Sequence, residues 1–192
     1  MFNDRTTPLS LLRTRRSGRP RDMIAPGQSD AQLAAMLEIA ARTPDHGKLA
    51  PWRFVIVPAQ ARARLGAVIT TAYRAERPQA AQTEIAALEA FATQAPALVV
   101  VLSHPKPESH IPLWEQELSA GAACMNLLHA AHAMGFVAGW VTGWPTYSDA
   151  VRDAFAAAPT RIAGFVFIGS PGAPLEERPR PALETVVSTW GD

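Results

Sequence analysis

Residues 97–102, Ala-Leu-Val-Val-Val-Leu, form an apolar run with no polar interruption. Such a run is typical of a strand buried on both faces of a sheet. Working outward from it, residues 54–57, 136–143 and 163–169 predict three further strands, each short and rich in β-branched or aromatic residues. The sequence therefore predicts a central sheet with apolar cover on both sides.

Helices are predicted between these strands. Ser29 and Gln32 form a capping-box pattern at the start of a helix that Pro44 ends. Residues 60–94 are alanine-rich with spaced charges, which predicts two solvent-facing helices. A long helix is expected over residues 114–134, and its middle is made of small residues: Ser119, Ala120, Gly121, Ala122, Ala123 and Cys124. Small residues permit the close approach of another backbone, so we expect this helix at the molecular centre or at a subunit contact.

The last residues, 170–192, differ in character. Four prolines predict an extended arm, and residues 184–190 predict one last strand. An arm that carries Val186, Val187 and Trp190 needs an apolar surface, for which a second subunit is the natural candidate. The order of elements lacks the regular alternation of a doubly wound fold. We therefore expect one α+β domain over residues 1–192, with a mixed sheet and a C-terminal arm.

Composition excludes several classes of protein. The formal net charge of +1 gives no general attraction to nucleic acid or to an anionic membrane. The one cysteine, Cys124, excludes an internal disulfide and a four-cysteine zinc site, which agrees with a reducing compartment. The longest apolar region, residues 120–133, is too short to span a bilayer, and no apolar segment follows the N-terminal arginines as a signal peptide would require. We expect a cytoplasmic protein.

The sequence contains neither of the two common glycine-rich phosphate-binding motifs, G-x-G-x-x-G and G-x-x-x-x-G-K-[ST]. A bound phosphate would therefore be held mainly by side chains, and arginine suits this because its planar fork matches phosphate oxygens. Residues 15–19, Arg-Arg-Ser-Gly-Arg, are the obvious place. Taken alone, this spacing favours a solvated basic terminus over a phosphate site.

A second polar segment is Arg42-Thr43-Pro44-Asp45-His46, followed by Pro51-Trp52. Proline after Thr43 stiffens the turn, so that the side chains of Arg42, Asp45 and His46 converge in a short loop. The residues alone favour a binding loop and an ordinary helix end about equally.

Metal binding and nucleophilic catalysis find little support. His129 and His132 are three residues apart on the long helix, but no carboxylate or cysteine stands at ligand spacing with them. Cys124 lies among alanines, which is typical of a small buried residue. We predict no metal site and no side-chain nucleophile.

Taken together and in chain order, these segments resemble the nitroreductase family, in particular its small bacterial members. The resemblance extends over most of the chain. Its motifs are Arg15-Arg16-Ser17, Arg42 to His46 with Pro51-Trp52, Pro112 to Gly121, Gly135-Phe136, Trp140 with Gly143, Gly164-Phe165, and Gly169-Ser170-Pro171.

The resemblance implies a mixed sheet wrapped by helices, a C-terminal arm exchanged within a homodimer, and FMN at the dimer interface. Arg15, Arg16 and Ser17 would hold the FMN phosphate and ribityl chain. Other residues that the family pattern implies are Arg42 and His46 at the flavin, from either subunit; Trp140, Val141 and Thr142 along the isoalloxazine ring; and Ala130, Ala131, His132, Ala133, Met134 and Gly135 at the nicotinamide cofactor.

One residue departs from the family pattern. Small relatives tend to carry an arginine after the tryptophan, where this chain has Val141. If that arginine helps to hold the phosphate, Arg178 or Arg180 is the replacement that we expect, and we select Arg178.

The implied activity is reduction by NADH or NADPH, through flavin N5, of a small-molecule acceptor such as a nitroaromatic or a quinone, with ping-pong kinetics. A protein that stores or senses FMN, and a specialised flavoenzyme on the same fold, are the alternatives. An arginine-rich interaction module fits the near-neutral charge less well.

Overall fold

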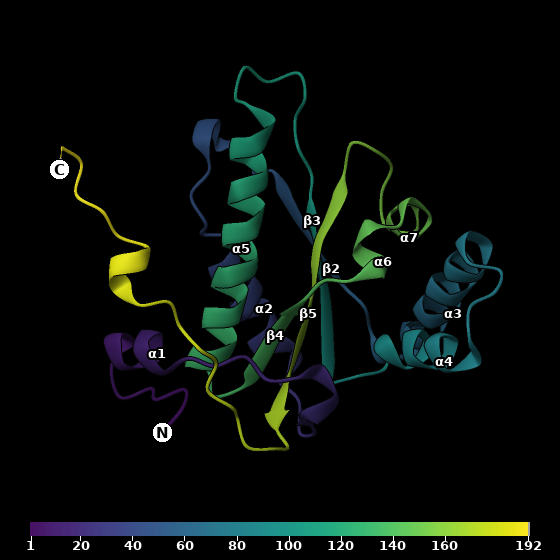
Figure 1. The fold of residues 1–192 in the computed structure, drawn as a ribbon, viewed down its shortest axis with the longest axis horizontal. Coiled ribbons are helices and arrows are strands. Elements are labelled where there is room, and N and C mark those ends of the chain that lie inside the picture. Colours follow the sequence, from purple (N-terminus) through teal and green to yellow (C-terminus); the bar gives the residue numbers. More distant parts are fainter. Residues whose placement is uncertain (192) are drawn as a thin grey trace.

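Five strands form the sheet at the centre of the computed structural model, which describes residues 1–191 (Figure 1). Their order across the sheet is β1-β5-β3-β2, and β4 also pairs with β5. The strands are β1 (Met23–Ile24), β2 (Trp52–Ile56), β3 (Ala97–Ser103), β4 (Val137–Val141) and β5 (Arg161–Pro171). Sequence analysis predicted all of these except the two-residue β1, which is too short to show a pattern.

All four strand pairings are antiparallel. The mixed sheet that we expected from the sequence is therefore wrong. The reason lies in the position of β5. The long helix α5 (Leu113–Ala133) carries the chain back along the sheet between β3 and β4, so these two strands point the same way. However, β5 lies between them and runs antiparallel to both. The predicted α+β class is confirmed.

Helices cover both faces of the sheet (Figure 1). One face carries α5 and α2 (Asp30–Ala40), which starts with the predicted Ser29–Gln32 capping box. The other face carries α3 (Ala59–Glu76), α4 (Gln82–Phe91), α6 (Trp144–Tyr147) and α7 (Asp149–Asp153). The remaining helices are α1 (Pro8–Thr14) and three 3-10 turns at Pro20–Asp22, His46–Lys48 and Leu183–Thr185.

The core confirms the double-sided burial that the apolar run predicted. Every residue of β3 is buried. On one face Val99 and Val101 pack in a cluster with residues of α2 and α5, whereas Val100 on the other face packs with residues of α3. The small residues of α5 let this helix lie close to the sheet, where Ala120 and Ala123 form a cluster with Trp52 of β2. The closeness of α5 to the sheet therefore explains its composition.

The predicted solvent-facing helices α3 and α4 each bury one side, and α3 buries an arginine. The side chain of Arg62 donates hydrogen bonds to four carbonyl oxygens, at distances of 2.7–3.3 Å: those of Val57, Gln94, Ala95 and Pro96. These carbonyls lie at the end of β2 and in the turn before β3. Arg62 thus ties α3 to two strand ends, with backbone oxygens in place of a carboxylate partner.

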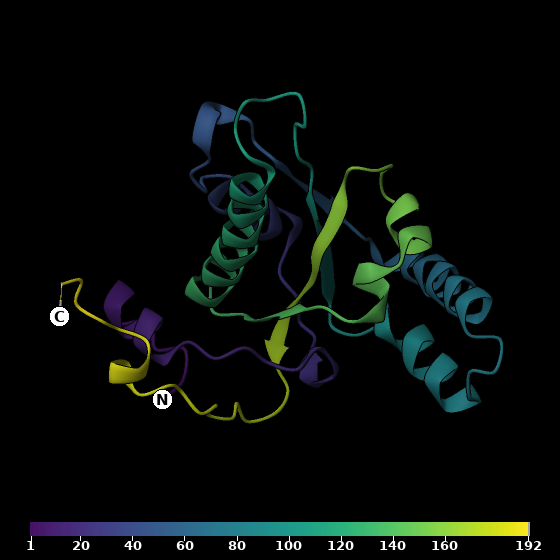
Figure 2. The ribbon, with the colours of Figure 1, turned by 45° about the horizontal axis from the view of Figure 1, so that its top comes forward.

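The C-terminal arm runs beside the N-terminal segment and then leaves the body of the protein (Figures 1 and 2). The predicted strand over residues 184–190 is wrong for this chain, since a 3-10 turn occupies residues 183–185 and no strand follows among the described residues. A strand needs a partner edge, and the arm meets none. Its apolar side chains are exposed, Trp190 almost completely.

Candidate functional site

The basic segment after α1 lies along the outer edge of β4. Helix α1 starts at its N-cap Thr7 and ends at Thr14, which delivers Arg15 at its C-cap. Gly18 N–H then donates to the carbonyl of Ala138, at 3.3 Å. This close pass requires glycine, because a Cβ on Gly18 would lie 2.3 Å from Val137 Cγ1 and a Cβ on Gly139 would lie 2.7 Å from Gly18 O.

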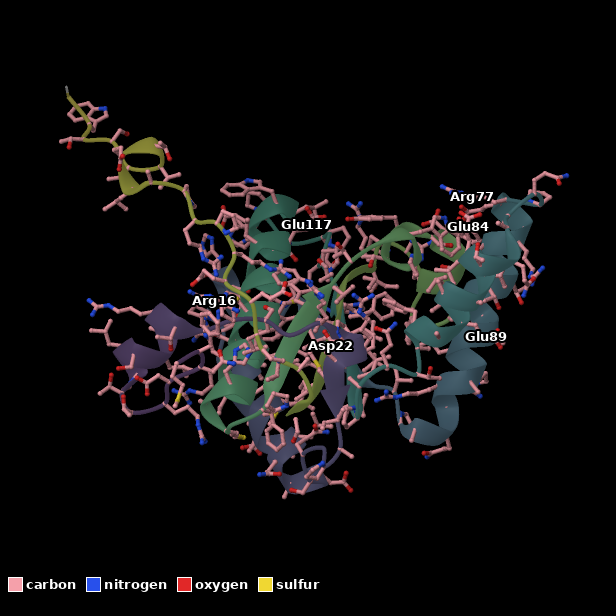
Figure 3. All side chains as sticks on the ribbon, turned by 60° about the horizontal axis from the view of Figure 1, so that its bottom comes forward. Arg16, Asp22, Arg77, Glu84, Glu89 and Glu117 are labelled. Carbon is pink, nitrogen blue, oxygen red and sulfur yellow. The ribbon has the colours of Figure 1, made fainter. Side chains whose placement is uncertain are left out.

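Two arginines of the arm join two arginines of this segment. Arg16 and Arg180 lie at the same Glu177 carboxylate, Arg15 donates to Ser17 Oγ, and Arg178 lines a cleft with Ser17, so the four arginines share one region. Burial first, and then the charges of Arg180, Arg16 and Arg178, lower the pKa of Arg15. Figure 3 shows Arg16 beside the arm. Within residues 1–191, no carboxylate lies within 4 Å of the Arg15 guanidinium. The region therefore has an excess of positive charge that suits an anion.

Ser17 belongs to the same region. Its Oγ accepts a hydrogen bond from Arg15 at 3.2 Å, and Ser17 and Arg178 line one cleft of about 380 Å³. Four of the predicted FMN residues, Arg15, Arg16, Ser17 and Arg178, are thus brought together from opposite ends of the chain.

The predicted ring-contacting residues form the end of β4 and its continuation. The Trp140 side chain lies over Gly164, its Nε1 donates to Ala163 O at 3.0 Å, and it is partly exposed on the α5 side of the sheet. The Val141 side chain packs against the cluster on the opposite face. Only the backbone of Val141 can therefore belong to the same surface as the indole.

Backbone groups add donors and acceptors along this edge. Both backbone groups of Ala138 point away from β5, because its N–H donates to His132 Nε2 and its C=O accepts from Gly18. Groups on an edge strand alternate with a period of two. By this alternation the N–H and C=O of Trp140, and the N–H of Thr142, face the open edge as well.

The loop that carries Arg42 and His46 packs against α5. It is fastened to α5 by three contacts: His46 Nδ1 lies 2.9 Å from Glu115 Oε2, Ser119 Oγ donates to Pro44 O, and Asn126 Nδ2 donates to Thr43 Oγ1 at 2.7 Å. The pKa of His129 is lowered first by burial and then by the charge of Arg15, so Arg15 lies near this end of α5. The fourteen residues of α5 between Glu115 and His129 span about 21 Å. The structure therefore does not bring His46 to the arginine cluster of its own chain, whereas Thr43, next to Arg42, contacts α5 only three residues before His129.

The segment predicted for the nicotinamide cofactor forms the end of α5. Ala130, Ala131 and His132 are buried in the core, so their side chains face the sheet. Ala133 and Gly135 are exposed, at the far end of β4 from Thr142. The six residues do not form a common surface, and their role stays a prediction.

His132 makes folding stability depend on pH. It is completely buried, and its pKa falls from 6.5 to about 4, first through burial and then through the charge of Arg15. The unfolded chain takes up this proton near pH 6.5 and the folded chain only near pH 4. The contribution of neutral His132 to the free energy of unfolding is therefore complete above pH 6.5 and is lost as the pH falls toward 4. About 2 kcal/mol of it is lost at pH 5. Urea unfolding at pH 7 and pH 5 should show this loss.

The His132→Gln variant should remove most of that pH dependence, whereas His110→Gln, at an exposed position, should keep it. An equal pH dependence in wild type and His132→Gln would contradict this assignment.

The described residues offer no additional candidate for a nucleophile or for a metal site. Burial raises the pKa of the Cys124 thiol to about 12, so it is uncharged at neutral pH. Among residues 1–191, no three His, Cys, Asp or Glu side chains are grouped as metal ligands. No helix of this part of the chain is long and apolar enough to cross a membrane.

Two acidic residues of the site, Glu176 and Glu177, were not predicted from the sequence. Glu177 forms an ion pair with Arg16, and Glu176 pairs with Arg19 at 2.6 Å. The available signal was the Glu176-Glu177 pair in an arm that must pack against something. It could not be matched to the basic segment because about 160 residues separate them.

The sheet, its helical layers and the basic segment at the open edge define an α+β fold of known type. A nitroreductase-like family protein of Bacillus cereus superposes with a TM-score of 0.80 at 20% identity, covering 97% of each chain. A candidate nitroreductase of Desulfovibrio desulfuricans, solved in complex with FMN, superposes with a TM-score of 0.73 at 23% identity, covering 95% of this chain and 97% of the other.

Sequence similarity identifies the family. Residues 12–170 match the nitroreductase family, and YdjA of Escherichia coli (strain K12), named as a candidate NAD(P)H nitroreductase, is 34% identical over 164 residues. That alignment covers 85% of this chain and 87% of YdjA. The chain belongs to the nitroreductase family of oxidoreductases.

Proposed function

We propose that this protein is an FMN-dependent NAD(P)H oxidoreductase that works as a homodimer and reduces flat acceptors such as nitroaromatics and quinones. The observation that carries the proposal is the cluster of four arginines beside the open edge of β4. The name of YdjA and the FMN complex of the Desulfovibrio protein agree with it. The single buried cysteine fits a cytoplasmic location.

The cluster fits the phosphate of FMN. Arg15 is partly buried, lacks a carboxylate partner among the described residues and shares a hydrogen bond with Ser17. A phosphate dianion would supply the missing negative charge and accept bidentate hydrogen bonds. Arg15, Ser17 and Arg178 would hold it, with Arg180 close by.

The edge of β4 fits a flat ring with polar atoms on its rim. The N–H groups of Trp140 and Thr142 would donate to the ring, and the backbone of Val141 would lie beneath it. Bound FMN supplies hydride chemistry at N5. The task of the protein is then to fix the ring and to leave one face open for NAD(P)H and the acceptor in turn.

Two features support a homodimer. Apolar side chains are exposed on the first half of α5 and on the arm: Leu113, Trp114, Leu118, Leu183, Val186, Val187 and Trp190. Covering them with a second copy would remove this surface from water. A second copy could also supply His46, which lies far from the arginine cluster of its own chain, together with Arg42 of the same loop.

The visible spectrum of the purified protein tests the proposal. We expect one FMN per chain, a dimer in analytical ultracentrifugation, and oxidation of NADH or NADPH that depends on nitrofurazone or menadione. A yellow protein without turnover would favour FMN storage or sensing. Colourless protein that does not bind added FMN would refute flavin function altogether.

A further inference from the structure

The Glu177 carboxylate lies in the middle of the arginine cluster. It pairs with the Arg16 guanidinium, lies 3.9 Å from Arg180 Nη2 and accepts a hydrogen bond from the backbone N–H of Arg178 at 2.8 Å. One carboxylate thus contacts both the N-terminal segment and the part of the arm that carries two of the four arginines.

Arg16 connects this carboxylate to the N-terminus. Its Nη1 donates to Arg15 O at 2.7 Å, its guanidinium lies over the Phe2 ring at 4.9 Å, and its backbone N–H donates to Asn3 Oδ1 at 2.8 Å. Its side chain is only 11% exposed. Arg16 is therefore held on several sides by protein groups, although its Nε finds no acceptor among the described residues. Within residues 1–191 the side chain of Arg15 has one hydrogen bond, to Ser17.

We infer that Glu177 is a positioning residue: through its ion pair with Arg16, it ties the arm to the N-terminal segment and places Arg178 and Arg180 beside Arg15. Arg15 and the arm arginines then bind the phosphate, and Arg16 acts through Glu177. This inference rests on the proposed FMN function. It also changes the role that sequence analysis gave to Arg16, from phosphate ligand to anchor of the arm.

The sign of the effect separates this role from simple electrostatics. Glu177 puts a negative charge near the site of a phosphate dianion, so Coulomb repulsion alone predicts that Glu177→Gln tightens FMN binding. A positioning role predicts weaker binding, because the arm loses its anchor and ordering it then opposes binding. We expect the dissociation constant of FMN to rise about tenfold in Glu177→Gln, measured by quenching of flavin fluorescence.

Glu176→Gln is the matched control. It removes the same charge from the neighbouring residue, but its ion pair with Arg19 is solvent-exposed on both sides and is worth little. Its FMN affinity should equal that of wild type or be slightly higher. Hydrogen exchange of residues 172–182 in the FMN-free protein gives a second readout: exchange should accelerate in Glu177→Gln and stay unchanged in Glu176→Gln.

A charge exchange completes the experiment. The double variant Arg16→Glu/Glu177→Arg keeps the ion pair with reversed polarity, and it should recover most of the affinity lost in Arg16→Ala. Affinity that stays as low as in Arg16→Ala would show that Arg16 itself touches the phosphate and would overturn the inference. Wild-type or tighter binding by Glu177→Gln, or an equal loss in Glu176→Gln, would overturn it too. If wild-type protein fails to bind FMN, the proposed function fails instead.

Discussion

Arg15→Ala is expected to raise the dissociation constant of FMN by about 100-fold, or about 2.7 kcal/mol. Arg15 is partly buried and lies beside three other arginines, and no carboxylate within residues 1–191 pairs with it. Charge-assisted hydrogen bonds to a phosphate are among the strongest in proteins, and they strengthen as water is excluded. Titration of FMN-free protein with FMN measures the change.

Two variants give this experiment its controls. Arg13→Ala removes an exposed arginine from the last turn of α1 and should bind FMN like wild type. Arg15→Lys keeps the charge but loses the bidentate fork, so its affinity should fall between those of Arg15→Ala and wild type. Replacing Arg15 by alanine removes its charge repulsion with Arg16, Arg178 and Arg180. The FMN-free Arg15→Ala protein should therefore melt no lower than wild type. An unchanged FMN affinity in Arg15→Ala would remove this cluster from the phosphate site.

Arg62→Met is expected to lower the free energy of unfolding by about 3 kcal/mol, because it leaves four carbonyl oxygens without their donor in a buried place. For a chain of this length, that loss corresponds to a fall in Tm of roughly 6–12 °C. Thermal unfolding followed by circular dichroism measures it. FMN stoichiometry at low temperature should be unchanged, since Arg62 lies on the α3 side of the sheet, away from the arginine cluster.

Arg64→Met is the matched control for this change, because it replaces an exposed arginine two residues along the same helix. It should move Tm by no more than about 1 °C. Arg62→Lys should recover part of the loss, since one ammonium group has three donors and cannot reach every carbonyl. A Tm of Arg62→Met equal to that of Arg64→Met would show that water can replace the guanidinium donors.

Local patterns predicted most of the elements. The run at residues 97–102 specified β3 and its double-sided burial, and Ser29 with Gln32 specified the start of α2. Strand direction could not be read in this way. The pairing of β5 between β3 and β4 depends on contacts between segments far apart in the chain, and no periodicity records them. The mixed sheet and the strand at residues 184–190 were wrong for that reason.

The candidate site, too, was predicted only in part, because some of its contacts join distant segments of the chain. The resemblance pointed to Arg15 and Ser17, and the departure from the family pattern at Val141 pointed to Arg178. The structure places these three residues together. Glu177 was missed because its meaning depends on a partner at the other end of the chain. Val141 was read as a ring contact, yet alternation along β4 turns its side chain to the opposite face.

The close pass of Gly18 over Ala138, with the arm packed beside it, has a consequence for biosynthesis. The basic segment leaves the ribosome well before the strand on which it rests, and the arm arginines emerge after both. The sheet and its helical layers can therefore assemble once β5 has emerged, before the arm arginines are present. We expect a nascent chain halted before residue 170 to bind no FMN, because Arg178 and Arg180 of the proposed site are still missing.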